Sequence, residues 1–160
     1  MSYLRDKDEK CYILCKLQSR LFERSVEEGI PSMYFFKVFF NSKYCQMLDD
    51  LSYFNFDITD DEIFNYVKSN VHMKRGTILP EYVMGWIGYL LREWAYVYNL
   101  RSKQITRKVP LSYLSSVYNP YHSLDVQKAI QLIVEDKKLD INDDPQIRLM
   151  RILRKTYFNL

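Results

Sequence analysis

Apolar residues recur at steps of three and four along most of the chain, which is the period of amphipathic helices. The first stripe of this kind comprises Cys11, Leu14, Cys15, Leu21, Phe22 and Val26. Asp6 or Asp8 can cap the start of the helix, Gly29 lies where a helix would end, and Pro31 prevents its continuation. The pattern therefore predicts one long helix between Asp8 and Gly29.

Shorter helical patterns follow in the first half of the chain. A helix from Ser32 is expected to bury Met33, Phe36, Phe39 and Phe40, and a third, after Asn41 or Ser42, to bury Tyr44, Met47, Leu48 and Leu51. The brief alternation from Ser52 to Asp57 predicts a short extended segment rather than a sheet. Thr59 and Glu62 have the spacing of a capping box, which predicts a helix through Ile63, Phe64 and Val67.

The second half begins after a loop expected at Val71 to Leu79. Pro80 then starts the strongest helical pattern, Glu81 to Asn99, which is apolar on most sides and is therefore expected to be central. Further helix starts are predicted at Ser102, Pro110, Asp125 and Pro145. The fold class is all-α: a compact bundle of about eight helices around the aromatic helix 81–99. We expect a single domain over 1–160, with 1–70 and 80–160 as candidate subdomains.

Composition supports a globular helical protein. Hydrophobic residues make up 48% of the 160 residues, and the chain has only 4 Gly, which are too few for a turn-dense β protein. No stretch reaches 18 uncharged apolar residues, and the N-terminal decapeptide lacks an apolar signal core. Three cysteines, an odd number, do not suit a secreted disulfide framework. These features predict a cytoplasmic protein with no membrane association.

Charge is unevenly distributed although the net charge is only +3. Six acids and no base lie between Met47 and Val67, namely Asp49, Asp50, Asp57, Asp60, Asp61 and Glu62. Basic residues cluster in two places, first at Arg101, Lys103, Arg107 and Lys108 and then at Arg148, Arg151, Arg154 and Lys155. Such faces either are ordinary solvated surface or orient a charged partner during encounter.

The sequence offers no convincing catalytic or cofactor site. Cys11 and Cys15 share a helix face, but a metal site would need further ligands, and buried core cysteines explain the pattern better. His122 has Ser123 and Asp125 nearby, yet side chains so close in sequence rarely form a triad, and a helix boundary accounts for them. Four glycines cannot supply a phosphate-binding glycine loop. We therefore predict a non-enzymatic protein without metal or cofactor.

Arg92 stands among aromatic residues on the predicted central helix. Arginine with exposed tryptophan and tyrosine is typical of a binding hot spot, but a buried, stacked arginine would give the same pattern, and both interpretations stay open. The candidate partner-binding residues are Trp86, Tyr89, Arg92, Trp94, Tyr96, Tyr118, Tyr121, His122 and Asp125. On the same helix, Gly85 and Gly88 have a small-residue spacing that lets another helix approach closely.

Nucleic acid binding is the alternative. The segment from Ser102 to Tyr113 has the outline of a helix-turn-helix, although its second part lacks the polar face of a recognition helix. Contacts to phosphates would come from the basic residues Arg101, Lys103, Arg107, Lys108, Arg148, Arg151 and Arg154.

The stretch from Tyr82 to Glu135 resembles a family of small bacterial proteins associated with operons of the toxin–antitoxin type. The match is carried by Trp86-Ile87-Gly88-Tyr89, Arg92, Trp94, Ser102-Lys103-Gln104-Ile105, Leu114, Tyr118, Tyr121-His122-Ser123-Leu124-Asp125 and Ala129-Ile130. The first half is similar at Lys16-Leu17-Gln18, Phe22-Glu23 and Phe39-Phe40-Asn41-Ser42. The chain departs from the family at Glu93, where members have tyrosine, and at Val126, where they have proline.

The resemblance implies an antitoxin-like or accessory role and supplies no active site. The expected partner is a toxin encoded by an adjacent gene, some such toxins resembling ADP-ribosyltransferases, and self-association is left open. The leading prediction is thus a protein that neutralises a toxin by direct contact, with the acidic stretch from Asp49 to Glu62 steering a basic partner.

Overall fold

Every regular element in the described part of the chain is helical, as predicted. The computed structural model describes residues 4–158, except for the side chains of Ile147, Arg151 and 155–158 in the last helix. The described residues form α1 (Glu9–Glu27), α2 (Ser32–Phe40), α3 (Lys43–Asp49), the 3-10 helix η1 (Ser52–Asn55), α4 (Asp60–Ser69), α5 (Glu81–Val97), α6 (Ser102–Thr106), α7 (Leu111–Ser116), α8 (Tyr118–Tyr121), α9 (Val126–Lys137) and α10 (Pro145–Phe158). The prediction of about eight helices undercounts these, because it does not resolve short helices such as α8.

Side-chain caps fix where several helices begin. Oxygens of Asp8, Ser42, Thr59 and Asp125 each accept a backbone N–H in the first turn of the helix that follows, at 3.0 to 3.2 Å. Each bond satisfies one of the amides that a helix start leaves without a partner. The carboxylate of Glu62 accepts the hydroxyl of Tyr44 at 2.9 Å. The predicted capping box at Thr59 therefore contributes its threonine bond, while Glu62 ties α4 to α3.

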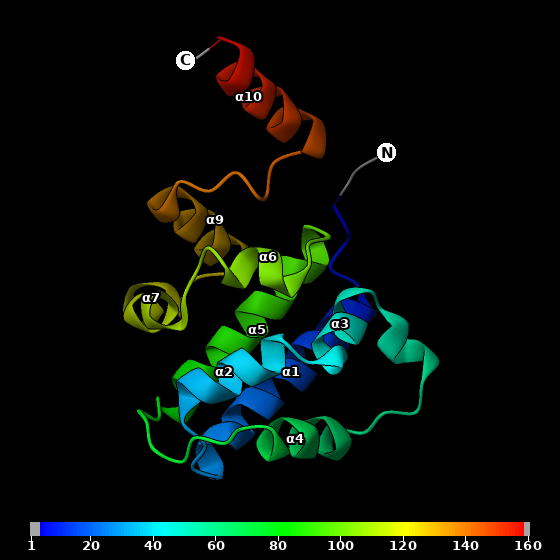
Figure 1. Cartoon of the computed structure of the whole chain (residues 1–160), viewed down its shortest axis with the longest axis vertical. Helices are drawn as coiled ribbons and strands as arrows, with labels where there is room; N and C mark the ends of the chain where they lie inside the picture. Colours follow the sequence, from blue (N-terminus) through cyan, green and yellow to red (C-terminus); the bar gives the residue numbers. More distant parts are fainter. Residues whose placement is uncertain (1–3, 159–160) are drawn as a thin grey trace.

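The core is continuous across the two halves of the chain. Helix α1 packs along α5, and α5 also contacts α6, α7 and α9 (Figure 1). At the α1 side of this contact, Phe22 meets the rings of α2 edge-on, namely Phe35, Phe36, Phe39 and Phe40. One cluster of buried residues thus draws on both 1–70 and 80–160.

Two glycines on α5 face α1 at close range. A Cβ at Gly88 would lie 2.9 Å from Cγ of Phe22 and 3.0 Å from the backbone oxygen of Gln18. A Cβ at Gly85 would lie 2.7 Å from Oε1 of Glu23, a half-exposed and flexible side chain. The predicted close helix approach is confirmed, and it is a contact within the fold.

We expect Gly88→Ala to lower the free energy of unfolding by about 1–3 kcal/mol, because the new methyl group meets backbone and a buried ring that cannot yield. Gly85→Ala is the matched control: the Glu23 side chain can move, and alanine gains up to about 1 kcal/mol of helix propensity over glycine. Urea denaturation of both variants tests this. Equal losses in the two variants would contradict the assignment of the tight contact to Gly88.

Two local predictions in the first half are wrong. Met33 is 54% exposed, whereas Phe35 is fully buried, because α2 turns Phe35 rather than Met33 toward Phe22. The segment expected to be extended forms the 3-10 helix η1 instead. Leu51 precedes it in the left-handed region at φ 65°, which turns the chain immediately after α3.

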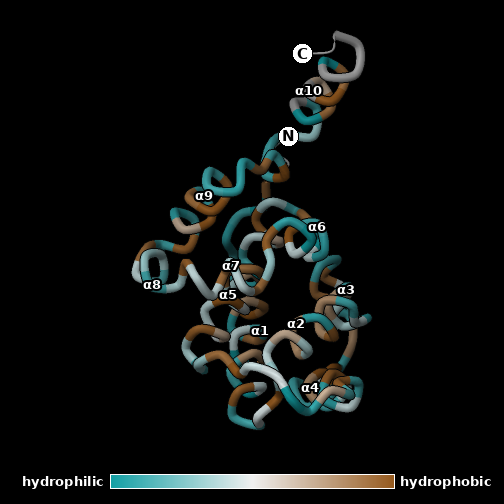
Figure 2. The backbone as a smooth tube through the Cα atoms, turned by 60° about the vertical axis from the view of Figure 1, so that its left-hand side comes forward, coloured by the Kyte–Doolittle hydropathy of each residue, from teal (hydrophilic) through white to brown (hydrophobic). Residues whose placement is uncertain are grey.

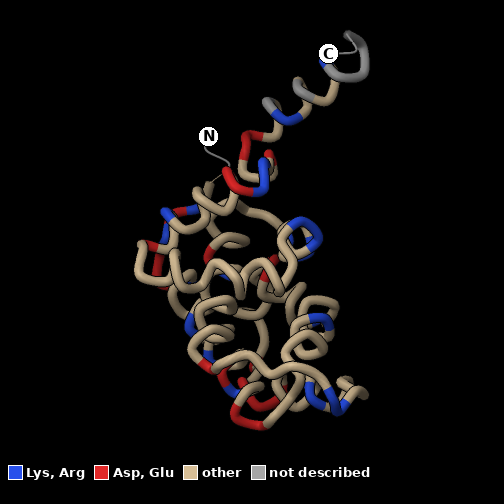
Figure 3. The backbone as a smooth tube through the Cα atoms, turned by 90° about the vertical axis from the view of Figure 1, so that its left-hand side faces the viewer, with Lys and Arg blue, Asp and Glu red and all other residues tan. Residues whose placement is uncertain are grey.

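Helix α10 projects away from the other helices (Figures 1 and 2). Its described apolar side chains are exposed, namely Leu149, Met150, Ile152 and Leu153. Acidic residues lie just before α10, whereas the helix itself carries bases and no acid (Figure 3). Among the described residues, none of the helices has both the length and the apolar character needed to span a bilayer.

Candidate functional site

Arg92 is buried and forms a polar network inside the fold. Its guanidinium donates from Nε to Oε1 of Gln18 at 2.8 Å and from Nη1 to Oδ1 of Asp49 at 2.6 Å. Nη2 lies 3.6 Å from Sγ of Cys45, and burial raises the pKa of that thiol, which stays neutral. Arg92 is 1% exposed, so the prediction that it contacts a partner is corrected: its charge is used within the core.

The carboxylate of Asp49 connects this network to α6. Oδ2 accepts the backbone N–H of Ser102 at 2.9 Å, and Oδ1 accepts its hydroxyl at 2.6 Å. Gln18 in turn donates from Nε2 to the carbonyl of Gly88 at 2.9 Å. The network therefore locks α1, α3, α5 and the start of α6 to one another.

Trp94 and Tyr96 are also interior residues. Trp94 is fully buried and donates from Nε1 to Oδ1 of Asn142 at 2.5 Å, and Tyr96 donates its hydroxyl to Oδ1 of Asp8 at 2.6 Å. Burial and this bond raise the pKa of Tyr96, which keeps the phenol neutral. The prediction that these two side chains contact a partner is corrected, because α5 is covered on both of the sides that bear them.

Three other predicted residues, Trp86, Tyr118 and His122, lie together near the surface. Tyr82, which is not among the residues predicted from the sequence, joins them, and we call these four residues the aromatic patch. The ring of Tyr118 stacks on His122 at 4.2 Å between centroids and meets Trp86 edge-on at 5.5 Å. Tyr82 lies 5.3 Å from Tyr118 and is 64% exposed. His122 Nδ1 is 2.8 Å from the carbonyl of Tyr118, which fixes the imidazole against the ring.

The remaining predicted aromatic residues lie beside or apart from this patch. Tyr121 donates its hydroxyl to Asp136 at 2.6 Å, and Tyr113 donates to the same carboxylate oxygen at 2.9 Å. These hydrogen bonds lower the pKa of Asp136. Tyr89 is half-buried, and burial raises its pKa to about 12. Asp125 is exposed and caps α9.

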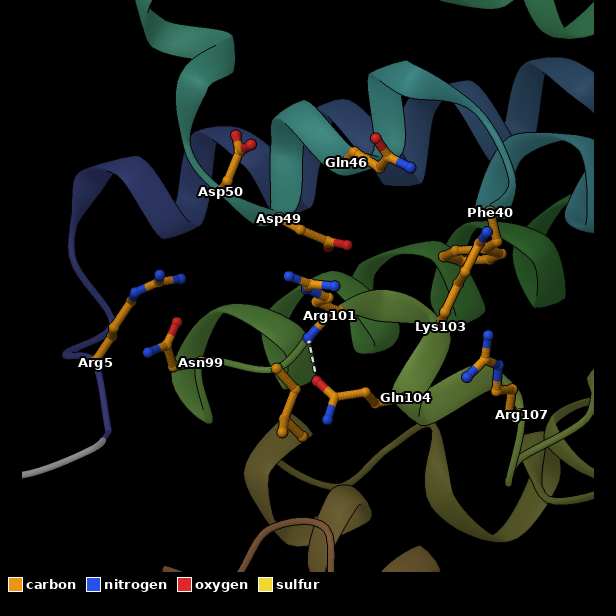
Figure 4. Close-up of a pocket in the computed structure, with 11 residues that line it drawn as sticks. Arg5, Phe40, Gln46, Asp49, Asp50, Asn99, Arg101, Lys103, Gln104 and Arg107 are labelled. Carbon is orange, nitrogen blue, oxygen red and sulfur yellow. Dashed lines mark hydrogen bonds between the residues drawn. The ribbon is translucent and has the colours of Figure 1, made fainter. Parts of the chain in front are cut away.

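A second surface feature, the basic cleft, has a volume of about 720 Å³. It opens between α3, α6 and the segment before α1 (Figure 4). Four cations line it, namely Arg5, Arg101, Lys103 and Arg107, together with Asp49, Asp50 and the amides of Gln46, Asn99 and Gln104. The basic cluster in the sequence indicated three of these cations, but not Arg5, which folding brings from a distant segment.

Some bases of the described chain are paired with acidic side chains, whereas the four cations of the basic cleft, like many other bases, are not. Arg20, Arg24 and Lys68 lie within 3.2 Å of carboxylates, and Lys7 lies 3.3 Å from Glu93. Within residues 4–158, no such ion pair involves the four cleft cations. Asp49, the carboxylate at the inner wall, is neutralised by Arg92. Asp50 is the other carboxylate of the lining, so the four cations leave the cleft with a net positive charge.

Other charged residues singled out in the sequence lie elsewhere. Lys108 is exposed and does not line the cleft, Arg148 and Arg154 lie on α10, and the side chain of Arg151 falls outside the described residues. Most of the acidic stretch has partners within the chain: Asp60 pairs with Arg20, Asp61 with Arg24, and Glu62 with Tyr44. Among the described residues, Asp50, Asp57 and Glu62 form no ion pair with a base, so about half of the charge of this stretch is not compensated.

The cysteines are buried, as predicted. Sγ atoms of Cys11 and Cys15 lie 3.9 Å apart, and this contact together with burial raises the pKa of Cys15. Across the described residues, histidine, cysteine and acidic side chains form no group of three or more that could hold a metal ion.

Comparisons with protein-family models, curated proteins and solved structures found no match to this chain. The resemblance to proteins of toxin–antitoxin operons therefore stays a prediction from the sequence. Candidate functions have to be argued from the aromatic patch and the basic cleft.

Proposed function

We propose that the chain is a non-enzymatic, cytoplasmic protein-binding module, and that the aromatic patch is its contact surface. The observation that carries the proposal is the assembly of the exposed rings of Tyr82 and His122 around the half-buried rings of Tyr118 and Trp86. Tyrosine and tryptophan combine a large apolar surface with a polar tip, which is why they dominate binding hot spots.

The rigidity of the patch supports this role. Tyr118 is held between Tyr82, Trp86 and the stacked imidazole, so little side-chain freedom is left to lose when a partner binds. Ordering a flexible side chain at an interface costs about 0.5–1.5 kcal/mol, and rings already in place avoid most of that cost. Tyr82 and Trp86 lie on α5, Tyr118 is the first residue of α8, and His122 caps the end of α8.

The finer proposal is that the module is antitoxin-like and neutralises a toxin encoded by an adjacent gene. It rests on the sequence resemblance through Trp86 and the Tyr121-to-Asp125 segment. Covering the active or substrate site of the toxin would require no chemistry from this chain.

The duplex-DNA alternative has weaker geometric support. A recognition helix must present an exposed polar face to base edges. Helix α6 spans five residues and buries Ser102 and Ile105, and α7 spans six and buries Leu111 and Leu114.

Coexpression with the product of the adjacent gene, followed by calorimetric titration, tests the proposal. We expect the double variant Tyr82→Ala, His122→Ala to bind at least about ten-fold more weakly, as hot-spot truncations do. Both side chains are exposed, so the free energy of unfolding should change by no more than about 0.5 kcal/mol. Phe56→Ala, which removes a 62% exposed ring outside the patch, is the control and should leave affinity unchanged.

Unaltered affinity in the patch variant would refute the patch as the contact surface. If the adjacent gene product does not bind while another protein binds through the patch, the toxin assignment fails and the binding-module proposal stands.

A further inference from the structure

The basic cleft continues into a second, more apolar groove of about 370 Å³. Phe40, Lys103 and Arg107 line both spaces, so the two are neighbours on one surface. The far part of the groove is formed by Met33, Tyr34, Phe36, Pro110 and Leu111, with Lys37, Asn41 and Thr106 as its polar lining. Cleft and groove together form an elongated site that is cationic at one end and mainly apolar at the other. It is lined by α2, α3, α6, the start of α7 and the segments before α1 and after α5, whereas the aromatic patch comes from α5, α8 and the residue that follows α8.

The cationic end has the chemistry of a phosphate site. Arginine presents donors in a planar fork that fits phosphate oxygens, and three of the four cations here are arginines, namely Arg5, Arg101 and Arg107. Because these groups lack carboxylate partners within the described residues, a bound anion would not have to displace an existing ion pair.

The apolar end offers a place for a ring. Tyr34 is half-buried and Met33 is exposed, so both present apolar surface to the groove. Lys103 and Arg107 lie at the junction of cleft and groove, where a phosphate attached to a ring-bearing group would pass.

We propose that the basic cleft and its adjoining groove bind a nucleoside diphosphate or triphosphate, with the phosphates among Arg5, Arg101, Lys103 and Arg107 and the base in the groove beside Tyr34. The volume of the cleft lies within the range of small-molecule sites, about 300–1,000 Å³. The proposal is independent of partner binding at the aromatic patch.

The walls of the site are fixed before any ligand arrives. Asp49 holds the N-terminus of α6 through two bonds from Ser102, which sets the position of the neighbouring Arg101. The backbone N–H of Arg101 donates to Oε1 of Gln104 at 2.8 Å. Arg5 is anchored by its own backbone N–H, which donates to the carbonyl of Val97 at 2.7 Å, and its guanidinium lies over the ring of Tyr96. Such preorganisation lowers the entropic cost of binding.

A carboxylate in the cleft favours a short phosphate chain over a long polyanion. Asp50, the C-cap residue of α3, lines the cleft and would repel phosphates that continued past the arginines, whereas the charge of Asp49 is already paired with Arg92.

Isothermal titration calorimetry of the full chain with ADP and ATP at low ionic strength is the test. We expect saturable one-to-one binding, and a loss of at least about ten-fold in affinity for each of Arg101→Gln and Arg107→Gln, since each removes charge-assisted bonds to phosphate. Arg154→Gln, which removes an exposed arginine on α10, is the matched control and should bind as the unaltered chain does. Tyr34→Ala should weaken ADP binding while leaving pyrophosphate binding unchanged.

Three results would overturn the proposal. The first is no saturable binding of ADP or ATP, and the second is an equal loss in Arg154→Gln and the cleft variants, which would indicate unspecific charge attraction. The third is a single-stranded oligonucleotide that binds the cleft more tightly than ATP with a steep salt dependence, which would assign the site to nucleic acid. Circular dichroism of each variant checks that the fold is retained.

Discussion

Replacing Arg92 with methionine is expected to lower the free energy of unfolding by about 3–5 kcal/mol, which is the cost of breaking a buried ion pair from one side. Methionine fills much of the volume but cannot donate. The carboxylate of Asp49, only 11% exposed, would lose its counter-charge, and Oε1 of Gln18 would lose its donor. Urea denaturation followed by circular dichroism measures the loss.

Two further variants separate this cause from a packing defect. Arg101→Gln changes an exposed arginine near the same carboxylate, and its effect should stay within about 0.5 kcal/mol. The double variant Arg92→Met, Asp49→Asn removes the uncompensated charge and should be more stable than Arg92→Met alone, which is a direct measure of coupling. The single variant Asp49→Asn completes the cycle: a double variant that loses the sum of the losses in Arg92→Met and Asp49→Asn would show that Arg92 and Asp49 do not stabilise each other.

Helix starts and the helical class could be predicted because their causes are local. Asp8, Thr59 and Asp125 cap helices within three residues of themselves, and the apolar period of α1 is visible in one stretch of sequence. The prediction of a short extended segment was wrong because the alternation on which it rested covers only a few residues. In the folded chain these residues form the 3-10 helix η1.

The candidate site was harder to predict because its causes are non-local. An arginine among aromatic residues fits both a binding hot spot and a buried core position. Arg92 can be buried because it bonds to Gln18 and Asp49, which lie 74 and 43 residues away in the sequence. One signal was present: a helix that is apolar on most sides leaves few exposed positions for a binding face. The same reasoning predicts that the side chain of Trp94 is buried, as it is in the structure.

The basic cleft could also be predicted only in part from the sequence. The cluster at Arg101, Lys103 and Arg107 was visible as charge, but its lack of carboxylate partners depends on where the acids go after folding. Asp49 is directed to Arg92, while Asp60 and Asp61 are directed to arginines on α1. The cleft keeps its positive charge because these acids pair with other arginines. The spacing of residues along the chain does not reveal that pairing.

Phe22→Ala is expected to lower the free energy of unfolding by about 3–5 kcal/mol, the range for deleting a fully buried phenylalanine. The ring is the meeting point of α1, α2 and α5: it lies 5.3 Å from both Phe35 and Phe39 between centroids, and it borders Gly88. Its removal leaves a cavity beside the rings of α2 and abolishes the edge-to-face contacts that these rings make with Phe22. Thermal and urea denaturation measure the loss.

Comparison variants distinguish the role of the ring from general hydrophobicity. Phe22→Leu keeps most of the apolar volume and should cost less than half as much as Phe22→Ala, about 1–2 kcal/mol. Phe56→Ala removes an exposed ring and should stay within about 0.5 kcal/mol. If Phe22→Ala cost no more than Phe56→Ala, the packing of α2 on the α1–α5 pair would not depend on this residue, and the close approach at Gly88 would need another cause.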